Sequence, residues 1–430
     1  MKQAGLRLEQ APPLWVPFLF FLVAPAFLLL TAAALLWSGP ATLAARTSAA
    51  AIGITHLYVL GFMAMVMIGA MMQILPVLQG SPVPLPRATA TLTFSGVASG
   101  ALLLPAGLLF GEGSLIQAGV VALAAGFAVF VLAILVCLAR APSQSHTVRA
   151  MWLAVLSLLV TVALGVVLAT RFGWGMALPN AAIQALHPAW GLLGWAGLLV
   201  MGVAFELVPM LQMTPHYPRP LSRFLGPVLF SLLLVWSVLL WRDEGGWSVL
   251  TTGLLAAMAA AYLVFAVVTV TLQLRRRRRL PDVTLDFWRV AMGSLALACL
   301  FWGARTALRA SWPESLDVVI GVLAMYGFAG FVISGMLCKI MPFLAWFHLQ
   351  AMCPPGVLAP NVKIILPDKD QRLQLRSQIA ALLLLCAAPL WPDLFTALAA
   401  VALAVTAVLL QRNMLTVIRS YGEAARRARS

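Results

Sequence analysis

The chain has 430 residues, of which 62% are hydrophobic and only 10% are charged, with a mean hydropathy of +0.98. A soluble domain is about half apolar and a quarter charged, so this composition excludes a water-soluble globular protein. The net charge of +15 comes from 28 basic and 13 acidic residues, without a soluble basic domain that could bind nucleic acid. The composition therefore predicts a polytopic membrane protein whose main partner is the lipid bilayer.

Twelve apolar runs have the length of a transmembrane helix. They lie near residues 14–37, 49–78, 89–110, 115–138, 150–170, 182–211, 224–241, 247–272, 288–308, 318–347, 377–393 and 395–415. We expect an all-α bundle of about twelve helices that forms a single integral membrane domain over residues 1–430. The first run is too long for the core of a signal peptide, so it is expected to remain as a helix.

The basic residues predict the orientation of this bundle. With the N-terminus in the cytoplasm, 22 of the 28 lysines and arginines fall on the cytoplasmic side and 5 fall outside. The sequence thus predicts that both termini are cytoplasmic, in a membrane that we take to be the bacterial inner membrane. The remaining basic residue is Lys339, inside an apolar run.

An internal repeat is visible in three of the apolar runs. They read GFMAMVMIGAMMQILPVL from Gly61, GWAGLLVMGVAFELVPML from Gly194 and GFAGFVISGMLCKIMPFL from Gly327, with an offset of 133 residues and no gap. The repeat predicts three four-helix units, about 1–140, 141–280 and 281–430, around a pseudo-threefold axis. The paired glycines in each copy should let neighbouring helices approach closely.

One position of the repeat is polar in all three copies: Gln73, Glu206 and Lys339. A charge inside the bilayer is expensive unless it is paired or neutralised. Glu206 and Lys339 therefore either form a buried ion pair that secures packing, or belong with Gln73 to a proton or ion path entered from the cytoplasmic side.

Two of the five histidines, His56 and His187, lie inside apolar runs in the outer half of the membrane. An imidazole at that depth needs a polar partner or a metal, so each is either a ligand or a satisfied core residue. Projection on an ideal helix places His187 on the face of Gly194 and His56 on the opposite face. This projection favours separate roles over one shared site.

Twelve helices, three four-helix units and outer-half histidines in the second and sixth helices resemble the catalytic subunit of heme-copper oxidases and nitric oxide reductases. Thr55-His56 before a methionine-rich run resembles the segment whose histidine ligates the low-spin heme, and His187-Pro188 resembles the segment with a copper ligand. The resemblance implies that His56 binds a b-type heme and that His187 binds a metal such as copper. Met325 is the candidate for the second heme ligand.

The sequence also departs from that family. Ala189 and Gly191 stand where the family has Glu and Tyr, and FSLLLVWSVLLW and VVIGVLAMYGF lack the histidines of helices 7 and 10. A copper ion with one histidine ligand and a high-spin heme without its proximal histidine cannot form a dioxygen site. The resemblance thus implies a divergent member, which is similar also to nitric-oxide-response membrane proteins.

Three functions are compatible with these residues. The first is electron transfer in respiratory or nitric-oxide-linked redox processes, with other membrane redox subunits or a cytochrome as partners. The second is a cofactor-free proton or small-solute transporter or channel, and the third is a structural subunit that lost its catalytic site. No GxGxxG, P-loop or CxxCH signature is present, so the sequence predicts neither Rossmann-type nucleotide binding nor covalent heme attachment, and no substrate is indicated.

Overall fold

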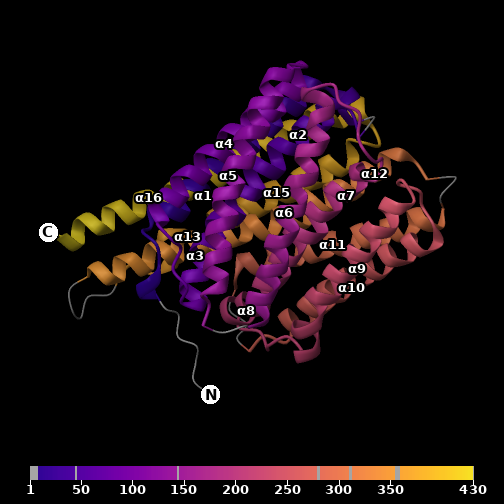
Figure 1. The fold of residues 1–430 in the computed structure, drawn as a ribbon. Helices are drawn as coiled ribbons and strands as arrows, with labels where there is room; N and C mark the ends of the chain where they lie inside the picture. The colour runs from indigo at the N-terminus through magenta and orange to yellow at the C-terminus, as the bar shows by residue number, and fades with distance from the viewer. Residues whose placement is uncertain are drawn as a thin grey trace.

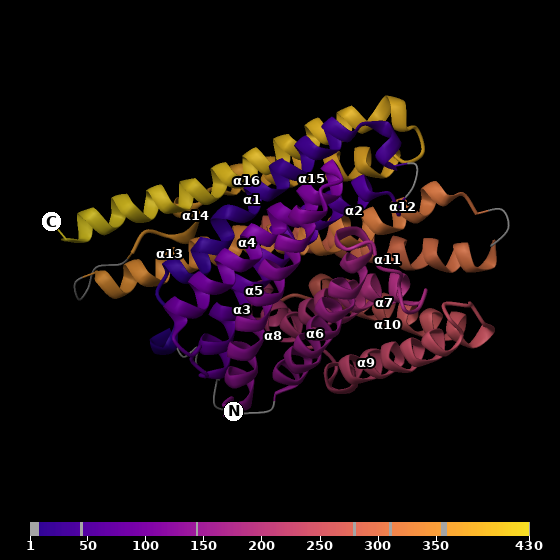
Figure 2. The same ribbon diagram turned by 45° about the horizontal axis from the view of Figure 1, so that its top comes forward.

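The computed structural model describes residues 8–43, 46–142, 145–277, 281–308, 312–353 and 359–429. Every regular element in these ranges is a helix, and they contain no strand. The helices pack side by side as one bundle, with α9 and α10 as a pair at its edge (Figures 1 and 2). The predicted all-α membrane bundle is confirmed.

The elements follow the chain in three stretches. The first contains η1 (Leu8–Gln10), α1 (Trp15–Ser38), η2 (Pro40–Leu43), α2 (Ala49–His56), η3 (Leu57–Ala64), α3 (Met65–Ile74), η4 (Leu75–Gln79), α4 (Pro86–Phe110) and α5 (Gly113–Ala139). The second contains α6 (His146–Gly173), α7 (Ile183–Ala189), η5 (Trp190–Gly197), α8 (Leu198–Gln212), α9 (Arg219–Arg242) and α10 (Val249–Leu274). The third contains α11 (Val283–Ala307), α12 (Glu314–Val322), η7 (Leu323–Gly330), α13 (Phe331–Met352), α14 (Val362–Ile365), α15 (Asp368–Ala387) and α16 (Pro392–Arg429).

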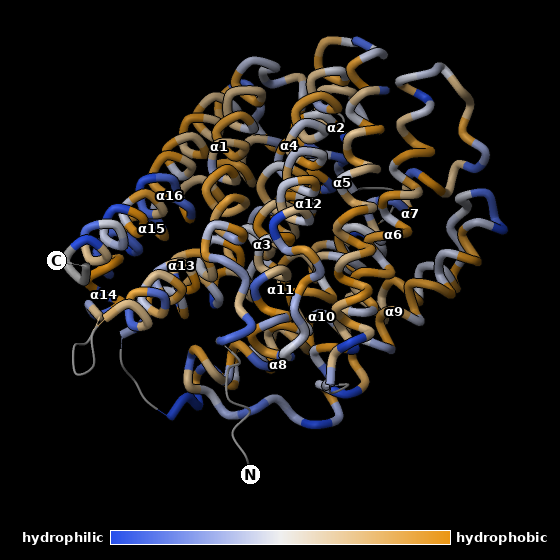
Figure 3. Tube along the Cα trace, turned by 60° about the vertical axis from the view of Figure 1, so that its left-hand side comes forward, coloured by the Kyte–Doolittle hydropathy of each residue, from blue (hydrophilic) through white to orange (hydrophobic). Residues whose placement is uncertain are grey.

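Eleven helices in the described part of the chain are long and apolar enough to cross a membrane. Hydrophobic residues follow their whole lengths, whereas hydrophilic residues gather at the turns (Figure 3). The eleventh predicted span, 377–393, is the one that differs from the prediction. Its helix, α15, begins nine residues earlier and ends at Ala387, and its first turns hold five charged residues: Asp368, Lys369, Asp370, Arg372 and Arg376. These charges lie in the first half of α15, whereas residues 379–387 are apolar, so α15 is not among the eleven spans.

The second, sixth and tenth predicted helices share an unusual backbone. Each changes from α-helix to π-helix over eight residues, at Leu57–Ala64, Trp190–Gly197 and Leu323–Gly330. These segments begin 133 residues apart, as the sequence repeat does. A π segment widens the helical turn, and such segments are frequent at functional sites. The match in backbone supports the three-unit arrangement, which we retain as a proposal.

The repeated glycines pack on the first helix of each stretch. A Cβ atom at Gly194 would lie 2.7 Å from Ser157 of α6, and one at Gly327 would lie 2.7 Å from Ser294 of α11. The corresponding atom at Gly61 would overlap the ring of Phe27 in α1. Glycine therefore sets the distance between these helix pairs in all three stretches.

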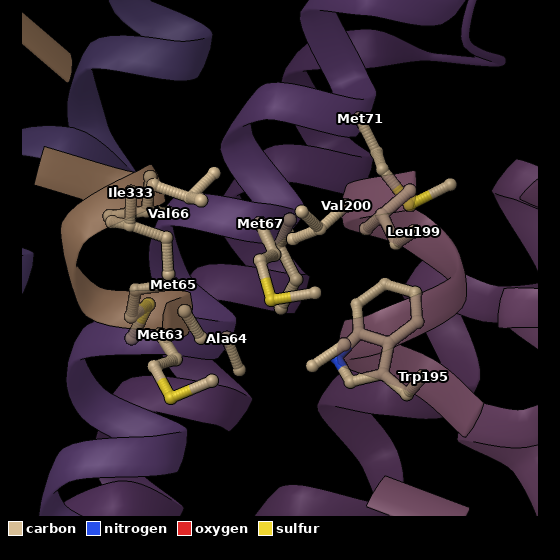
Figure 4. Packing of buried hydrophobic residues seen from close by; sticks show 14 of the residues in the cluster. Met63, Ala64, Met65, Val66, Met67, Met71, Trp195, Leu199, Val200 and Ile333 are labelled. Atoms are coloured by element: carbon tan, nitrogen blue, oxygen red, sulfur yellow. The ribbon is translucent and has the colours of Figure 1, made fainter. Parts of the chain in front are cut away.

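Methionine side chains fill much of the interior between the first two stretches. Met63, Met67 and Met71 lie close to Trp195 and Leu199 (Figure 4), and all five are buried. Unbranched thioether side chains adapt to the irregular space beside a π segment. These buried side chains form an apolar layer between the first two stretches.

Candidate functional site

His56 is the last residue of α2, directly before the π segment η3. Its Nδ1 lies 2.7 Å from the carbonyl oxygen of Ile52, one turn earlier. A carbonyl oxygen only accepts hydrogen bonds, so Nδ1 must carry the proton and donate it. The remaining nitrogen, Nε2, therefore keeps its lone pair for a metal.

His187 lies in α7, and a neighbouring helix holds its ring. Its Nδ1 is 3.0 Å from the carbonyl oxygen of Thr161 in α6 and must donate to it, by the same argument. Gly165 of α6 leaves room for the ring, because a Cβ atom there would lie 3.0 Å from Cε1 of His187. Nε2 of His187 is again the nitrogen with a free lone pair.

The two imidazole rings lie together. Their centroids are 6.0 Å apart, and their planes differ by only 10°. The projection on an ideal α-helix, which favoured separate roles, did not predict that the two rings lie together. Whether the two histidines share one role stays a prediction. The backbone becomes π-helical soon after each histidine, over Leu57–Ala64 and Trp190–Gly197, and these segments contain Gly61 and Gly194. The angles of an ideal α-helix therefore do not apply between each histidine and its glycine.

The two rings are themselves half-buried. Ile52, whose carbonyl oxygen binds His56, and Thr161 and Gly165, which contact His187, are all half-buried. Within the described residues, no group of three or more His, Cys, Asp or Glu side chains could hold a metal ion. The donor set of this site is thus two imidazole nitrogens in an apolar surrounding.

Met325, the predicted second heme ligand, lies in the π segment η7. Its carbonyl oxygen accepts a hydrogen bond from the hydroxyl of Tyr58, at 3.3 Å. Its side chain folds back along its own helix, since a Cβ atom at Gly321 would lie 3.6 Å from Cε of Met325. The role of Met325 as a ligand stays a prediction.

The three polar repeat positions are not joined to one another in the described residues. Lys339 forms an ion pair with Asp282, with 2.8 Å between Nζ and Oδ2. Glu206 lies beside Thr147 instead, and Gln73 is buried in α3. The predicted Glu206–Lys339 pair is therefore corrected to Asp282–Lys339. Asp282 precedes α11 in sequence and could not be assigned to the depth of Lys339 without the packing of α11 on α13.

Asp282 is the N-cap of α11 as well as the partner of Lys339. Its Oδ1 accepts hydrogen bonds from the backbone N–H and the hydroxyl of Thr284, at 3.0 and 2.7 Å. Burial raises the pKa of the Asp282 carboxyl, but the Lys339 ammonium and the two Thr284 bonds lower it more. The net pKa lies below the ordinary value, so the carboxyl is ionised at neutral pH.

Sequence reasoning missed the contact between two tyrosines, Tyr58 and Tyr326. Tyr58 follows His56 by two residues, and its ring centroid is 6.0 Å from that of Tyr326 in η7. The chain has only five tyrosines, and two of them stand just before the repeated segments that begin at Gly61 and Gly327. This position could have marked them as candidate functional residues. The other histidines, His146, His216 and His348, lie at helix ends or in a loop.

No protein-family model matches this chain, and no curated protein sequence matches it. Among solved structures, the chain is similar to a heme-copper terminal oxidase determined as a dimer by cryo-electron microscopy, with a TM-score of 0.60 and 11% identity. The match covers 96% of this chain and 84% of the oxidase chain. The protein therefore has a helical membrane fold that is distantly similar to that of heme-copper oxidases.

Proposed function

We propose that this membrane protein holds one metal centre between His56 and His187 and works in electron transfer. The observation that carries the proposal is the paired geometry of the two imidazoles. Both Nδ1 atoms are bound to backbone carbonyls, and the rings are parallel to within 10° at 6.0 Å. Metal-ligating histidines commonly donate their second ring nitrogen to such a carbonyl.

The spacing fits a single metal between the rings. Imidazole nitrogens bind metals at about 2 Å, which keeps two opposite ring centroids on the order of 6 Å apart. Low-spin heme b is the group that we favour, because the two imidazoles would hold its iron and it would supply one-electron transfer. Copper held by the same two imidazoles is the alternative cofactor.

In this proposal, the residues next to His56 and His187 orient the two imidazoles and limit the access of water. The carbonyls of Ile52 and Thr161 orient the imidazoles and increase their basicity as ligands. The apolar side chains around them limit the access of water, which tunes a redox potential. A bound heme would supply one-electron transfer. Dioxygen reduction is not proposed, because two histidines do not provide the ligands of a heme-copper pair.

The position in the outer half of the membrane suggests electron exchange with a cytochrome or with another membrane redox subunit. The bacterial inner membrane, with both termini in the cytoplasm, is the location that we propose from the distribution of basic residues.

We expect the purified protein to show a Soret band and sharp reduced-minus-oxidised bands in detergent. His56→Ala and His187→Ala should each remove most of the heme, because each substitution deletes one of the two imidazoles that would hold it. Heme content is measured as pyridine hemochrome per protein, and metal content by mass spectrometry. His216→Ala and His348→Ala are matched controls and should keep the full content.

The outcomes separate the alternatives. If His187→Ala retains all its heme while His56→Ala loses it, the two-histidine centre is contradicted, and Met325→Leu then tests the other axial ligand. If the protein binds copper and shows no Soret band, the heme is excluded but the site is retained. A protein without heme or metal would contradict the proposal.

A further inference from the structure

The helix pair α9–α10 carries a group of arginines at one end. Arg219 and Arg223 lie in the first two turns of α9, and α10 is followed by Arg275–Arg279, the longest run of basic residues in the chain. A short connection joins α9 to α10 and the two helices pack together, so the start of α9 and the end of α10 lie at the same end of the pair. Arg219, Arg223, Arg275 and Arg277 are all exposed there.

Two contacts fix the segments that carry these arginines. The hydroxyl of Tyr217, two residues before α9, lies 2.9 Å from the hydroxyl of Thr269 in α10. The backbone N–H of Arg277 donates a hydrogen bond to the carbonyl oxygen of Met213, at 3.0 Å. The segment before α9 and the segment after α10 are therefore held at the same end of the bundle, and their positive charges are concentrated there.

No carboxylate neutralises this group within the part of the chain that the structure describes. Arg219, Arg223, Arg275 and Arg277 form no ion pair with an aspartate or glutamate of those residues. Positive charges that lie close together repel one another and create a positive potential at the surface. This end of the helix pair is therefore suited to a negatively charged partner from outside the chain.

An apolar groove continues from the arginines along the outer face of α9, at the edge of the bundle (Figure 2). It is lined by Pro227, Val228, Ser231, Leu232 and Val235 of α9 and by Leu254 of α10. Its volume is about 310 Å³. Arg223 lies four residues before Pro227, about one helical turn away, so it is on the face that carries the groove. Beside it, Phe224 is 54% exposed, and its ring centroid is 5.2 Å from Cζ of Arg223. This face is thus cationic at its end and apolar further along.

We propose that this face of α9 binds an anionic phospholipid, with the lipid phosphate at the arginines and one acyl chain in the groove. Guanidinium groups bind phosphate oxygens through paired, charge-assisted hydrogen bonds. Clusters of four to eight basic residues next to a membrane helix attract anionic headgroups. The groove is the reason to choose a lipid over free phosphate, because an ion without an acyl chain makes no use of an apolar surface. The lipid site is independent of a metal at His56 and His187.

The headgroup is tested by native mass spectrometry of the purified protein in detergent, titrated with dioleoyl phosphatidylglycerol or dioleoyl phosphatidylcholine. These lipids share their acyl chains and differ in headgroup charge, and we expect the parent to bind the first on the order of tenfold more tightly. The triple variant Arg219→Gln/Arg223→Gln/Arg275→Gln should lose most of this preference. The control Arg171→Gln/Arg242→Gln, which changes exposed arginines at the opposite ends of α6 and α9, should keep it. Equal affinity of the parent for both lipids, or an equal loss in the control, would overturn the proposal.

The groove is tested with the same titration. Ser231→Trp fills the groove and should weaken the binding of phosphatidylglycerol severalfold, whereas Val238→Trp, at an exposed position of α9 outside the groove, should bind it as the parent does. Glycerol 3-phosphate, which has no acyl chain, should displace little of the bound lipid. Full displacement by glycerol 3-phosphate, or parent-like binding by Ser231→Trp, would contradict the lipid site and indicate a site for free phosphate. These residues lie on the surface, so each variant should stay monodisperse in size-exclusion chromatography. Neither titration bears on the heme content, so this proposal and the proposed function fail independently.

Discussion

Replacing Gly119 by valine is expected to destabilise the protein severely. Gly119 of α5 lies against the backbone of α4, where a Cβ atom would be 2.5 Å from the amide nitrogen of Leu104 and 2.9 Å from its Cα. About two turns further along the same pair of helices, a Cβ atom at Gly96 of α4 would lie 2.7 Å from Cα of Gly126 in α5. Neither helix can move one side chain aside to relieve such an overlap, because the obstructing atoms belong to the backbone.

We expect the loss to be about 3 kcal/mol or more, at or above the upper end of the usual range for overpacking. The measurement is the melting temperature in detergent, together with the yield of monodisperse protein. Gly253→Val is the matched control: Gly253 also lies in a membrane helix, but no atom lies within 4 Å of an added Cβ. Equal melting temperatures for the two variants would show that α4 and α5 do not pack through these glycines.

The second large effect is expected at the ion pair between Asp282 and Lys339. Their side chains are only 19% and 29% exposed, so the loss of one partner leaves a poorly solvated charge. We expect Asp282→Ala to cost about 2–4 kcal/mol, of which about 1 reflects the lost N-cap of α11. Lys339→Met should cost less, because Asp282 keeps the two hydrogen bonds from Thr284.

A double-mutant cycle measures the pair itself. Combining Asp282→Ala with Lys339→Met should cost less than the sum of the single changes, with a coupling on the order of 1 kcal/mol. Glu206→Gln is the control partner for Lys339→Met, and these two changes should add, since no ion pair joins them among the described residues. Additive losses for the Asp282 pair would contradict the ion pair.

The stability that the ionised Asp282 carboxyl contributes should decrease as the pH is lowered. The pKa of Asp282 is lower in the folded protein than its ordinary value of 3.8, so the unfolded chain binds a proton at higher pH. The stabilisation from the ionised Asp282 carboxyl is complete above its ordinary pKa of 3.8. It is lost as the pH falls through the lower pKa of the folded protein. The melting temperature of the parent should therefore fall more steeply below about pH 4 than that of Asp282→Asn.

The sequence was sufficient for the features that depend on local composition and spacing. Apolar length predicted a membrane bundle, because a helix must have about 20 apolar residues to cross the hydrocarbon core. The 133-residue repeat located the three segments that become π-helical, at Leu57–Ala64, Trp190–Gly197 and Leu323–Gly330. The resemblance drawn from His56 and His187-Pro188 led to the oxidase-like fold that the structural similarity supports.

Only the tertiary structure decided which side chains meet. His56 and His187 are 131 positions apart, yet their ring centroids lie 6.0 Å from each other in the folded bundle. Lys339 pairs with Asp282 because α11 starts beside α13, whereas equal positions in a repeat made Glu206 look like its partner. The sequence did not predict that the glutamines of α15 are buried, because they stand among charged residues. A polar stretch of sequence does not show which of its faces another helix will cover. Hydropathy and spacing are properties of a segment, but a partner at long range depends on helix direction, packing and register, and these arise only when the whole bundle assembles.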